Sequence, residues 1–260
     1  MLFRSKGEFI AVLDSDDIAL PDRLRLQYEF MINHPDIALC SGHADVIDGR
    51  GEYTGEKFIV PTGDHVEMYT LFLNPFVNSA SFFKTTVLRE LQGYRNYAPA
   101  EDFDFFLRVA EKYSVTNMDH VLVKYRKHGN STSLKSQFRI RETGTKILKE
   151  FHQRLHMDTD EAFAEIHYNL FSRNFQANTF GEFLSVLTSL QEGNRKFKRY
   201  PKEAFERLLF EKWQEVISEK KAGKKTLPLL LKSELSGISH LSFKQFRKAF
   251  KQSFWAYIKK

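Results

Sequence analysis

The segment from residue 9 to residue 17 limits the choice of fold more than any other part of the chain. The five apolar residues 9–13 lead directly into Asp14, Asp16 and Asp17, three carboxylates within four positions. A continuous apolar run predicts a strand buried on both faces of a mostly parallel sheet. Carboxylates that follow such a strand lie where open α/β sheets bind ligands. A divalent cation that carries phosphate oxygens would offset their repulsion, and an Asp-rich turn is the alternative interpretation.

A helix and a second strand are predicted immediately after the acidic residues. Pro21 precedes a helical pattern that ends before Pro35, because proline disfavours helix in the residue before it. Residues 37–40 then indicate another buried strand, so the order strand, acidic loop, helix, strand is typical of a βαβ-like unit. Asp17 could bind a metal or cap the following turn, and we favour capping.

Three further segments of the first half carry polar groups that could form a site. Glu101 and Asp102 begin a helical pattern rich in phenylalanine, where carboxylates either cap the helix or include a base whose pKa is raised by aromatic neighbours. Residues 74–83 read as an apolar strand interrupted by Asn78 and Ser79. A strand-like run at 121–125 leads into the basic and polar residues 125–133.

Three of these segments resemble motifs of glycosyltransferase family 2, the inverting nucleotide-sugar transferases of the GT-A fold. The matching residues are 7–17 with 21–24, then 100–109, then 125–133, in the family's order. The resemblance covers about residues 1–135 and implies an α/β domain, a GT-A-like mostly parallel sheet flanked by helices. Because Gly7 already adjoins the acidic strand, we expect the family's N-terminal nucleotide-binding strands, roughly 80 residues, to be missing, as in an N-terminally truncated chain.

The resemblance also implies which residues bind the donor and a metal. Asp16 would ligate a divalent ion, Mn²⁺ or Mg²⁺. Asp14 would contact the ribose or the metal shell, and His128 would be a further metal ligand or would contact the diphosphate. Asp14, Asp16, Arg126 and Asn78 would bind a nucleotide-sugar donor, expected to be UDP-linked. A buried strand would explain Asn78 equally well, and a structural histidine would explain His128.

In the reaction that the resemblance implies, Asp102 is the base and Glu101 stands beside it. The reaction is metal-dependent transfer of a sugar, with inversion, to a glycan or lipid-linked acceptor in cell-surface polysaccharide synthesis. The alternative is a catalytically incomplete fragment or non-catalytic subunit, motivated by the expected absence of nucleotide-binding strands. Metal-dependent phosphoester hydrolysis with the same carboxylates is a third interpretation.

The second half of the chain predicts a helical domain, so we expect domains at 1–135 and 136–260. Apolar residues at helical spacing predict helices near 138–156, 160–175, 179–192, 201–221 and 226–235, with a break at Gly193. Residues 241–260 combine an aromatic stripe with basic residues, typical of a basic amphipathic helix. This helix would either contact a membrane surface or dock on the protein's own core.

Charge and composition exclude several other classes. The net charge is +6, and residues 241–260 hold six lysines and arginines without an acidic residue, so the basic charge is confined to one tail. A nucleic-acid-binding surface is therefore not expected. The single Cys40 excludes a disulfide framework within the chain, and no apolar run approaches the ~20 residues of a membrane span. We expect a cytoplasmic protein, either free of the membrane or peripheral on its inner face.

Overall fold

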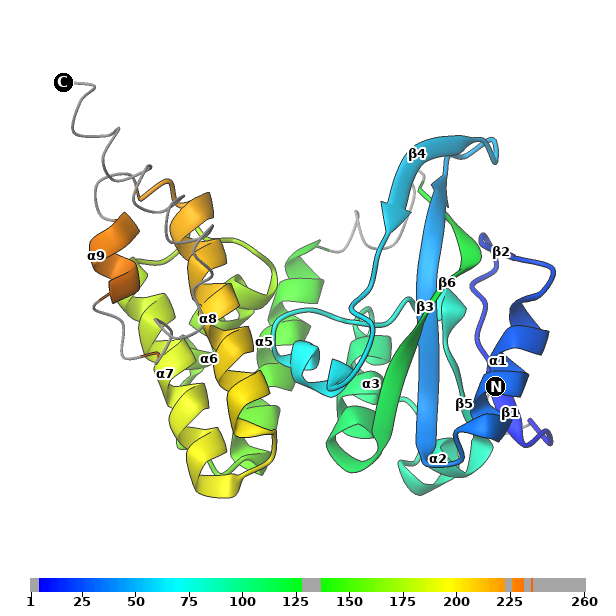
Figure 1. The fold of residues 1–260 in the computed structure, drawn as a ribbon, viewed down its shortest axis with the longest axis horizontal. Coiled ribbons are helices and arrows are strands. Elements are labelled where there is room, and N and C mark those ends of the chain that lie inside the picture. Colours follow the sequence, from blue (N-terminus) through cyan, green and yellow to red (C-terminus); the bar gives the residue numbers. More distant parts are fainter. Residues whose placement is uncertain (1–4, 128–136, 223–225, 232–234, 236–260) are drawn as a thin grey trace. The chain divides into compact units, whose positions relative to one another are not determined.

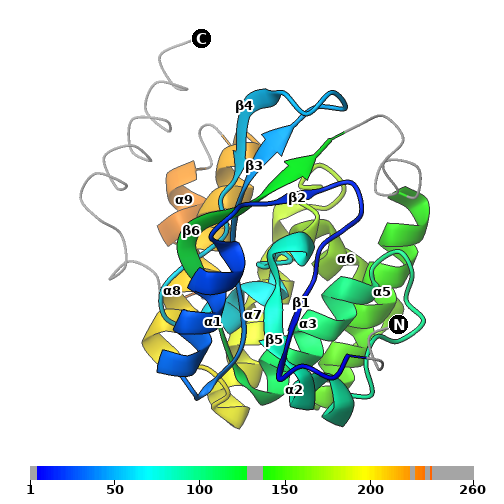
Figure 2. The same ribbon diagram turned by 90° about the vertical axis from the view of Figure 1, so that its right-hand side faces the viewer.

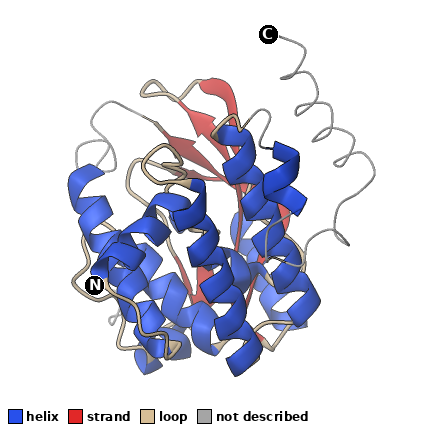
Figure 3. Ribbon diagram, turned by 90° about the vertical axis from the view of Figure 1, so that its left-hand side faces the viewer, coloured by secondary structure: helices blue, strands red, loops and turns tan. Residues whose placement is uncertain are grey.

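The structure of the chain is a computed structural model that describes residues 5–127, 137–222, 226–231 and 235. The chain divides into two compact units, Met1–Gly144 and Thr145–Lys260 (Figure 1). The first unit is an α/β domain built on a six-stranded sheet, and the described part of the second unit contains only helices (Figure 3).

The sheet of the first unit is mixed and mostly antiparallel. Its strands are β1 (Phe9–Ala11), β2 (Ile18–Ala19), β3 (Ile37–Ile47), β4 (Tyr53–Phe58), β5 (Phe82–Lys84) and β6 (Ser114–Arg126), and their order is β1-β5-β3-β6-β2, with β4 paired to β3. Of the strand pairs, β3 with β6 is parallel, and the other four are antiparallel. The prediction of a mostly parallel sheet is therefore wrong. A continuous apolar run reports burial on both faces of a sheet, whereas the chain connections decide the direction of each strand.

The predicted βαβ-like unit is split by a third strand. Strand β5 lies between β1 and β3 and is antiparallel to both, so β1 and β3 point the same way without pairing. The strand predicted over 74–83 is wrong in its extent: a 3₁₀ turn, η3 (Asn78–Ala80), precedes the three-residue strand β5. The polar Asn78 and Ser79 therefore lie in a turn at the end of the sheet.

Strand β1 is shorter and more exposed than its apolar sequence predicts. It ends at Ala11, and among its three residues Ile10 is the buried one. Ala11 is exposed, and Leu13, beyond the strand, is 46% exposed. The reason is its place in the sheet, because β1 is an end strand of the described sheet and pairs with β5 on one side.

Helices cover both faces of the sheet (Figures 1 and 2). Alternate residues of the central strands face opposite layers. Leu39 and Phe83 pack with residues of α2 (Thr85–Glu90) and α3 (Glu101–Lys112), whereas Cys40 and Phe82 pack with Met31 of α1 (Arg23–Asn33). A further 3₁₀ helix, η2 (Val66–Leu71), adds Val66 to the first of these cores.

The second unit contains five helices in the described residues, and α5 begins before its boundary. They are α5 (Gln137–Arg154), α6 (Glu161–Phe171), α7 (Phe180–Phe197), α8 (Lys202–Glu219) and α9 (Thr226–Leu231). All five agree with the predicted helical pattern. The break predicted at Gly193 is wrong, because α7 continues to Phe197 after a Thr179–Glu182 capping box at its start.

The basic segment at 241–260 lies outside the described residues. Its amphipathic helix and membrane contact therefore remain predictions. Within the helices that the structure describes, none has the length and apolar composition needed to cross a membrane.

Candidate active site

The acidic loop, which carries Asp14, Asp16 and Asp17, is held by hydrogen bonds from the turn η3, which precedes β5. The side chain of Asn78 donates to Asp14 Oδ1 at 3.1 Å, and Ser79 Oγ donates to Asp14 Oδ2 at 2.9 Å. In the other direction, the backbone N–H of Asp14 lies 3.1 Å from Ser79 Oγ. Two segments more than sixty residues apart in sequence thus hold one carboxylate in place. The 3₁₀ turn η3 gives Asn78 and Ser79 the orientation that this arrangement requires.

The start of helix α3 supplies a second pair of carboxylates. Glu101 and Asp102 are the first two residues of the helix, as the sequence predicts, and both are partly buried. Asn74 Nδ2 donates to Asp102 Oδ2 at 3.3 Å. Burial raises the pKa of Asp102 to about 6, with smaller contributions from the negative charges of Glu101 and Asp14. This confirms the expected direction of the shift and gives Asp102 a proton affinity suited to a general base near neutral pH.

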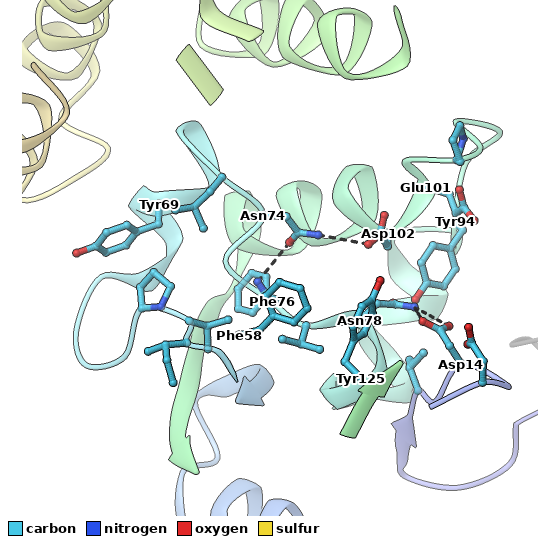
Figure 4. A pocket seen from close by; sticks show the side chains of 18 of the residues that line it. Asp14, Phe58, Tyr69, Asn74, Phe76, Asn78, Tyr94, Glu101, Asp102 and Tyr125 are labelled. Atoms are coloured by element: carbon cyan, nitrogen blue, oxygen red, sulfur yellow. Dashed lines mark hydrogen bonds between the residues drawn. The ribbon is translucent and has the colours of Figure 1, made fainter. Parts of the chain in front are cut away.

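Both sets of carboxylates line one cavity of about 1450 Å³ in the first unit (Figure 4). Of the residues predicted for the site, this cavity brings together Asp14, Asp16, Asn78, Glu101 and Asp102. The remainder of its wall is largely apolar and aromatic and includes Phe58, Ile59, Pro61, Tyr69, Leu73, Phe76 and Tyr125. A cavity with one acidic end and one aromatic wall suits a ligand that carries both phosphates, through a cation, and sugar or base rings.

Tyr94 is a cavity residue that the sequence analysis missed. Figure 4 shows its hydroxyl group on the side of the cavity where Asn78 and Asp14 lie. Burial raises the pKa of Tyr94 well above its usual range, and the charges of Asp102, Asp14 and Glu101 raise it further. The hydroxyl therefore keeps its proton and can donate a hydrogen bond inside the cavity. No motif in the sequence marks Tyr94, since its place depends on the packing of its ring against Phe105.

Arg126 lies beside the acidic loop but is absent from the cavity lining. Its Nε donates to the carbonyl of Asp16 at 2.7 Å, and its Nη1 donates to the carbonyl of Asp48 at 3.0 Å. The guanidinium is thus hydrogen bonded to backbone, and its proposed phosphate contact remains a prediction. His128 lies outside the described residues, so its metal role also remains a prediction.

The side chain of Asp17 binds the backbone of a distant strand, which differs from the capping of the following turn that we favoured. Its Oδ1 accepts a hydrogen bond from the backbone N–H of Arg126 at 2.8 Å, so it joins the acidic loop to the end of β6. The side chain is 8% exposed, and Oδ2 is buried without a hydrogen-bond partner in the described structure. Burial is the largest cause of its raised pKa.

The residues of the acidic loop fit a divalent cation that brings most of its own ligands. In the part of the chain that the structure describes, no three His, Cys, Asp or Glu side chains converge as a preformed metal site. Asp14 and Asp16 nevertheless present two carboxylates to the same cavity. Mg²⁺ is commonly held by one or two carboxylates, with substrate phosphates and water completing the shell. The oxygen donors present therefore suit Mg²⁺ or Mn²⁺ bound together with a diphosphate.

The fold and this site define an α/β protein with a cavity lined by two sets of carboxylates, and comparison with known sequences identifies the family. The profile of glycosyl transferase family group 2 matches residues 9–153. The match covers more than half of the chain and includes both acidic segments. The chain therefore belongs to glycosyl transferase family group 2.

Curated relatives carry related descriptions. The O-antigen biosynthesis glycosyltransferase WbnJ of Escherichia coli is 31% identical over 152 residues, which cover 57% of this chain and 58% of that protein. The uncharacterized glycosyltransferase MJ1057 of Methanocaldococcus jannaschii is 32% identical over 127 residues, 47% of this chain and 43% of that protein. The amylovoran biosynthesis glycosyltransferase AmsE of Erwinia amylovora is 26% identical over 126 residues, 48% of this chain and 47% of that protein. The chain thus spans about half the length of the curated relatives it matches.

Among solved structures, the chain is similar to S. aureus TarS 1-349 in complex with UDP-GlcNAc. The TM-score is 0.45 with 17% sequence identity, and the match covers 98% of this chain and 67% of TarS 1-349.

Proposed function

We propose that the chain transfers a sugar from a nucleotide-diphosphate sugar to a hydroxyl group of a glycan or lipid-linked acceptor, with inversion at the anomeric carbon. The observation that carries this proposal is that Asp14, Asp16 and Asp102 line the same cavity. Family membership supports sugar transfer as the reaction class, and relatives described as acting in O-antigen and amylovoran biosynthesis support a polysaccharide acceptor.

In this proposal Asp102 is the general base. Its carboxylate accepts the proton of the acceptor hydroxyl while the hydroxyl oxygen forms a bond to the anomeric carbon. The bond from that carbon to the diphosphate oxygen breaks, and the nucleotide diphosphate leaves with the electron pair. A pKa of about 6 suits this role, because the carboxylate is mostly ionised at pH 7 and still basic enough to accept a proton. Asn74 orients the carboxylate through its hydrogen bond to Oδ2.

The acidic end of the cavity is the proposed donor site. Asp14 and Asp16 would hold Mg²⁺ or Mn²⁺, which when bound neutralises the charge that develops on the leaving diphosphate. Asn78 and Ser79 keep the Asp14 carboxylate in a fixed orientation, and Tyr94 offers a neutral hydroxyl donor on the same side. The aromatic wall would contact the nonpolar faces of sugar or base rings.

Titration calorimetry with UDP, UDP-sugars and other nucleotide diphosphates, with and without Mn²⁺, tests the donor site. We expect Mn²⁺-dependent binding by the wild type and a loss of about tenfold or more in Asp16→Asn, since one charged metal ligand is removed. Asp22→Asn is the matched control. Asp22 is exposed at the start of α1, away from the cavity lining, so this variant should bind like the wild type.

A turnover assay separates donor binding from catalysis. We expect Asp102→Asn to bind UDP normally and to lose about 10²- to 10⁴-fold in UDP release with an oligosaccharide or lipid-linked sugar acceptor, the range for loss of a general base. Donor binding without turnover in the wild type would favour the alternative of a non-catalytic subunit. A folded wild-type protein that binds none of the nucleotide diphosphates with Mn²⁺ would overturn the proposal.

A further inference from the structure

Helix α1 buries a charged side chain that has no carboxylate partner in the described structure. Arg23 is 2% exposed, and its hydrogen bonds go to Gln27 Oε1 at 2.9 Å and to the carbonyls of Val12 at 2.7 Å and Ser81 at 3.2 Å. Gln27, which is fully buried one turn later, donates to the carbonyl of Ala80 at 2.7 Å. Burial lowers the pKa of Arg23 to about 10, so the guanidinium remains charged at neutral pH. Burying an unpaired charge is costly, which requires an explanation beyond packing.

The carbonyls that Arg23 binds belong to the two segments that form the donor site. Val12 precedes Asp14 by two residues, and Ser81 follows Ser79 by two residues. The two segments also bond directly, since the N–H of Val12 donates to the carbonyl of Ser81 at 2.9 Å. Arg23 therefore binds both segments at the point where they leave the sheet. Beyond that point they meet again through the hydrogen bonds of Asp14 with Ser79.

We propose that Arg23 and Gln27 are positioning residues for the donor site. Together they form a polar clamp, defined here as the side chains of Arg23 and Gln27, on the carbonyls of Val12, Ala80 and Ser81. The clamp fixes the spacing between the acidic loop and the turn η3, and thus the direction in which the Asp14 carboxylate enters the cavity. The proposal rests on the proposed function, because its consequence for binding assumes that Asp14 holds the metal and donor.

The sheet alone does not provide this spacing. Strand β1 contributes three residues to its pairing with β5, and it pairs on one side in the described sheet. A short end strand resists local opening poorly, because few hydrogen bonds hold it. A guanidinium offers several N–H donors in a fixed planar fork, so it can join two backbone segments where a lysine ammonium, a point charge, cannot hold the same geometry.

Hydrogen exchange on the free protein tests the clamp without any ligand. In Arg23→Lys we expect faster exchange in the peptides that contain the N–H groups of Val12 and Asp14 and in the peptide over 78–81, at unchanged exchange elsewhere in the sheet. Met31→Val is the matched control. Met31 is 1% exposed on the same helix and packs against Cys40 and Phe82, so this variant loses core packing without touching the clamped carbonyls. Unchanged exchange in Arg23→Lys would overturn the proposal.

Donor titration then connects the clamp to binding. We expect Arg23→Lys to weaken Mn²⁺-dependent UDP affinity by about tenfold, and Gln27→Met to weaken it less. The melting temperatures of both variants should be no lower than that of Met31→Val. Met31→Val itself should bind UDP with normal affinity. Ethylguanidinium should restore affinity to Arg23→Ala by refilling the guanidinium site. If the Arg23 variants do not fold, the UDP affinity of Gln27→Met tests the positioning role instead.

The outcomes separate this proposal from the proposed function. A wild type that binds none of the nucleotide diphosphates refutes the donor site, and hydrogen exchange alone then decides whether the clamp exists. Normal UDP affinity in a folded Arg23→Lys variant would overturn the positioning role. So would a loss of affinity in Met31→Val as large as in Arg23→Lys, since the effect would then follow stability.

Discussion

The carboxylate of Asp102 shows how neighbouring groups set the chemistry of one residue. Burial raises its pKa to about 6, and the charges of Glu101 and Asp14 act in the same direction. The hydrogen bond from Asn74 favours the ionised form and therefore opposes this rise. Hydrogen bonds from the backbone N–H groups of Phe103 and Asp102 also lower the pKa. The pKa of Asp102 is thus a balance between burial and negative charge on one side and these hydrogen-bond donors on the other, and a change in either should move the pH at which the base becomes active.

We predict that Asn74→Ala shifts the acid limb of the pH profile upwards. Asp102 acts as a base only when ionised, so kcat/KM should fall as the pH drops through about 6 in the wild type. Removing the Asn74 donor destabilises the ionised form, raises the pKa, and moves this limb to higher pH. The measurement is kcat/KM between pH 4.5 and 9, with exposed Asn33→Ala as the control. An acid limb at the same pH in both variants would contradict the prediction.

At the scale of elements, helices α5 and α6 meet through a buried pair of histidines. His152 Nε2 lies 2.7 Å from His167 Nδ1, the two rings are stacked, and both side chains are fully buried. His152 Nδ1 lies 3.1 Å from Thr159 Oγ1. Burial, and then the neighbouring His167, lower the pKa of His152 to about 2. The contact between these helices therefore requires a neutral His152.

We predict that acid destabilises the second unit through this pair. The unfolded chain binds a proton at His152 below about pH 6.5, whereas the folded chain does not until about pH 2. The contribution of His152 to the free energy of unfolding is therefore complete above pH 6.5. It falls as the pH drops from 6.5 towards 2, by at most about 1.4 kcal/mol per pH unit. Urea unfolding followed by tryptophan fluorescence measures this, since both tryptophans, Trp213 and Trp255, belong to the second unit.

A double variant and a surface variant provide the comparison for this pH dependence. His152→Leu with His167→Leu removes both rings and should flatten the dependence between pH 4 and 6.5. Exposed His120→Gln should keep the wild-type slope. A double variant that loses stability with acid as steeply as the wild type would show that other groups cause the effect.

Two glycines in regular elements should respond oppositely to alanine. In α7, a Cβ at Gly193 would meet Met157 Sδ at 3.6 Å, an ordinary contact, so Gly193→Ala should stabilise the protein by about 0.5–1 kcal/mol through a less flexible unfolded chain. In β3, a Cβ at Gly42 would lie 2.8 Å from the carbonyl oxygen of His120. Gly42→Ala should therefore cost about 1–3 kcal/mol by separating β3 from β6. Urea denaturation measures both, and equal signs would contradict the prediction.

At the scale of the whole molecule, the proposed ligands act on the first unit. Every residue that lines the cavity belongs to Met1–Gly144. A ligand that binds the folded state alone stabilises it by mass action. Donor binding should therefore be visible as a stability change of the first unit, with no need for an acceptor.

We predict that UDP with Mn²⁺ raises the melting temperature and that chelation reverses the rise. At a UDP concentration about 100 times Kd, the stabilisation should be about 2.7 kcal/mol. EDTA should remove it, because Asp14 and Asp16 alone cannot hold the diphosphate by charge attraction. Differential scanning fluorimetry measures the shift, with Asp22→Asn expected to match the wild type and Asp16→Asn expected to lose the shift. A shift that persists in EDTA would contradict metal dependence.

The sequence by itself determined most of the regular elements and several residues of the cavity wall. The 3.6-residue and continuous apolar patterns report burial and turn geometry, which are local properties. They therefore identified α1, the start of β3, α3, the last part of β6 and the helices of the second half. The family motifs, together with the polar segment between them, also indicated five residues that line one cavity: Asp14, Asp16, Asn78, Glu101 and Asp102.

Only the tertiary structure decided the order and direction of the strands and the neighbours of each site residue. The insertion of β5 between β1 and β3 made the sheet mostly antiparallel and left β1 half-exposed. The contacts of Asn74 with Asp102 and of Arg23 with Ser81 join residues 28 and 58 positions apart. A local sequence pattern cannot predict such contacts, because they depend on how separate elements pack together. For that reason Asn74, Tyr94 and Arg23 became visible only in the folded chain.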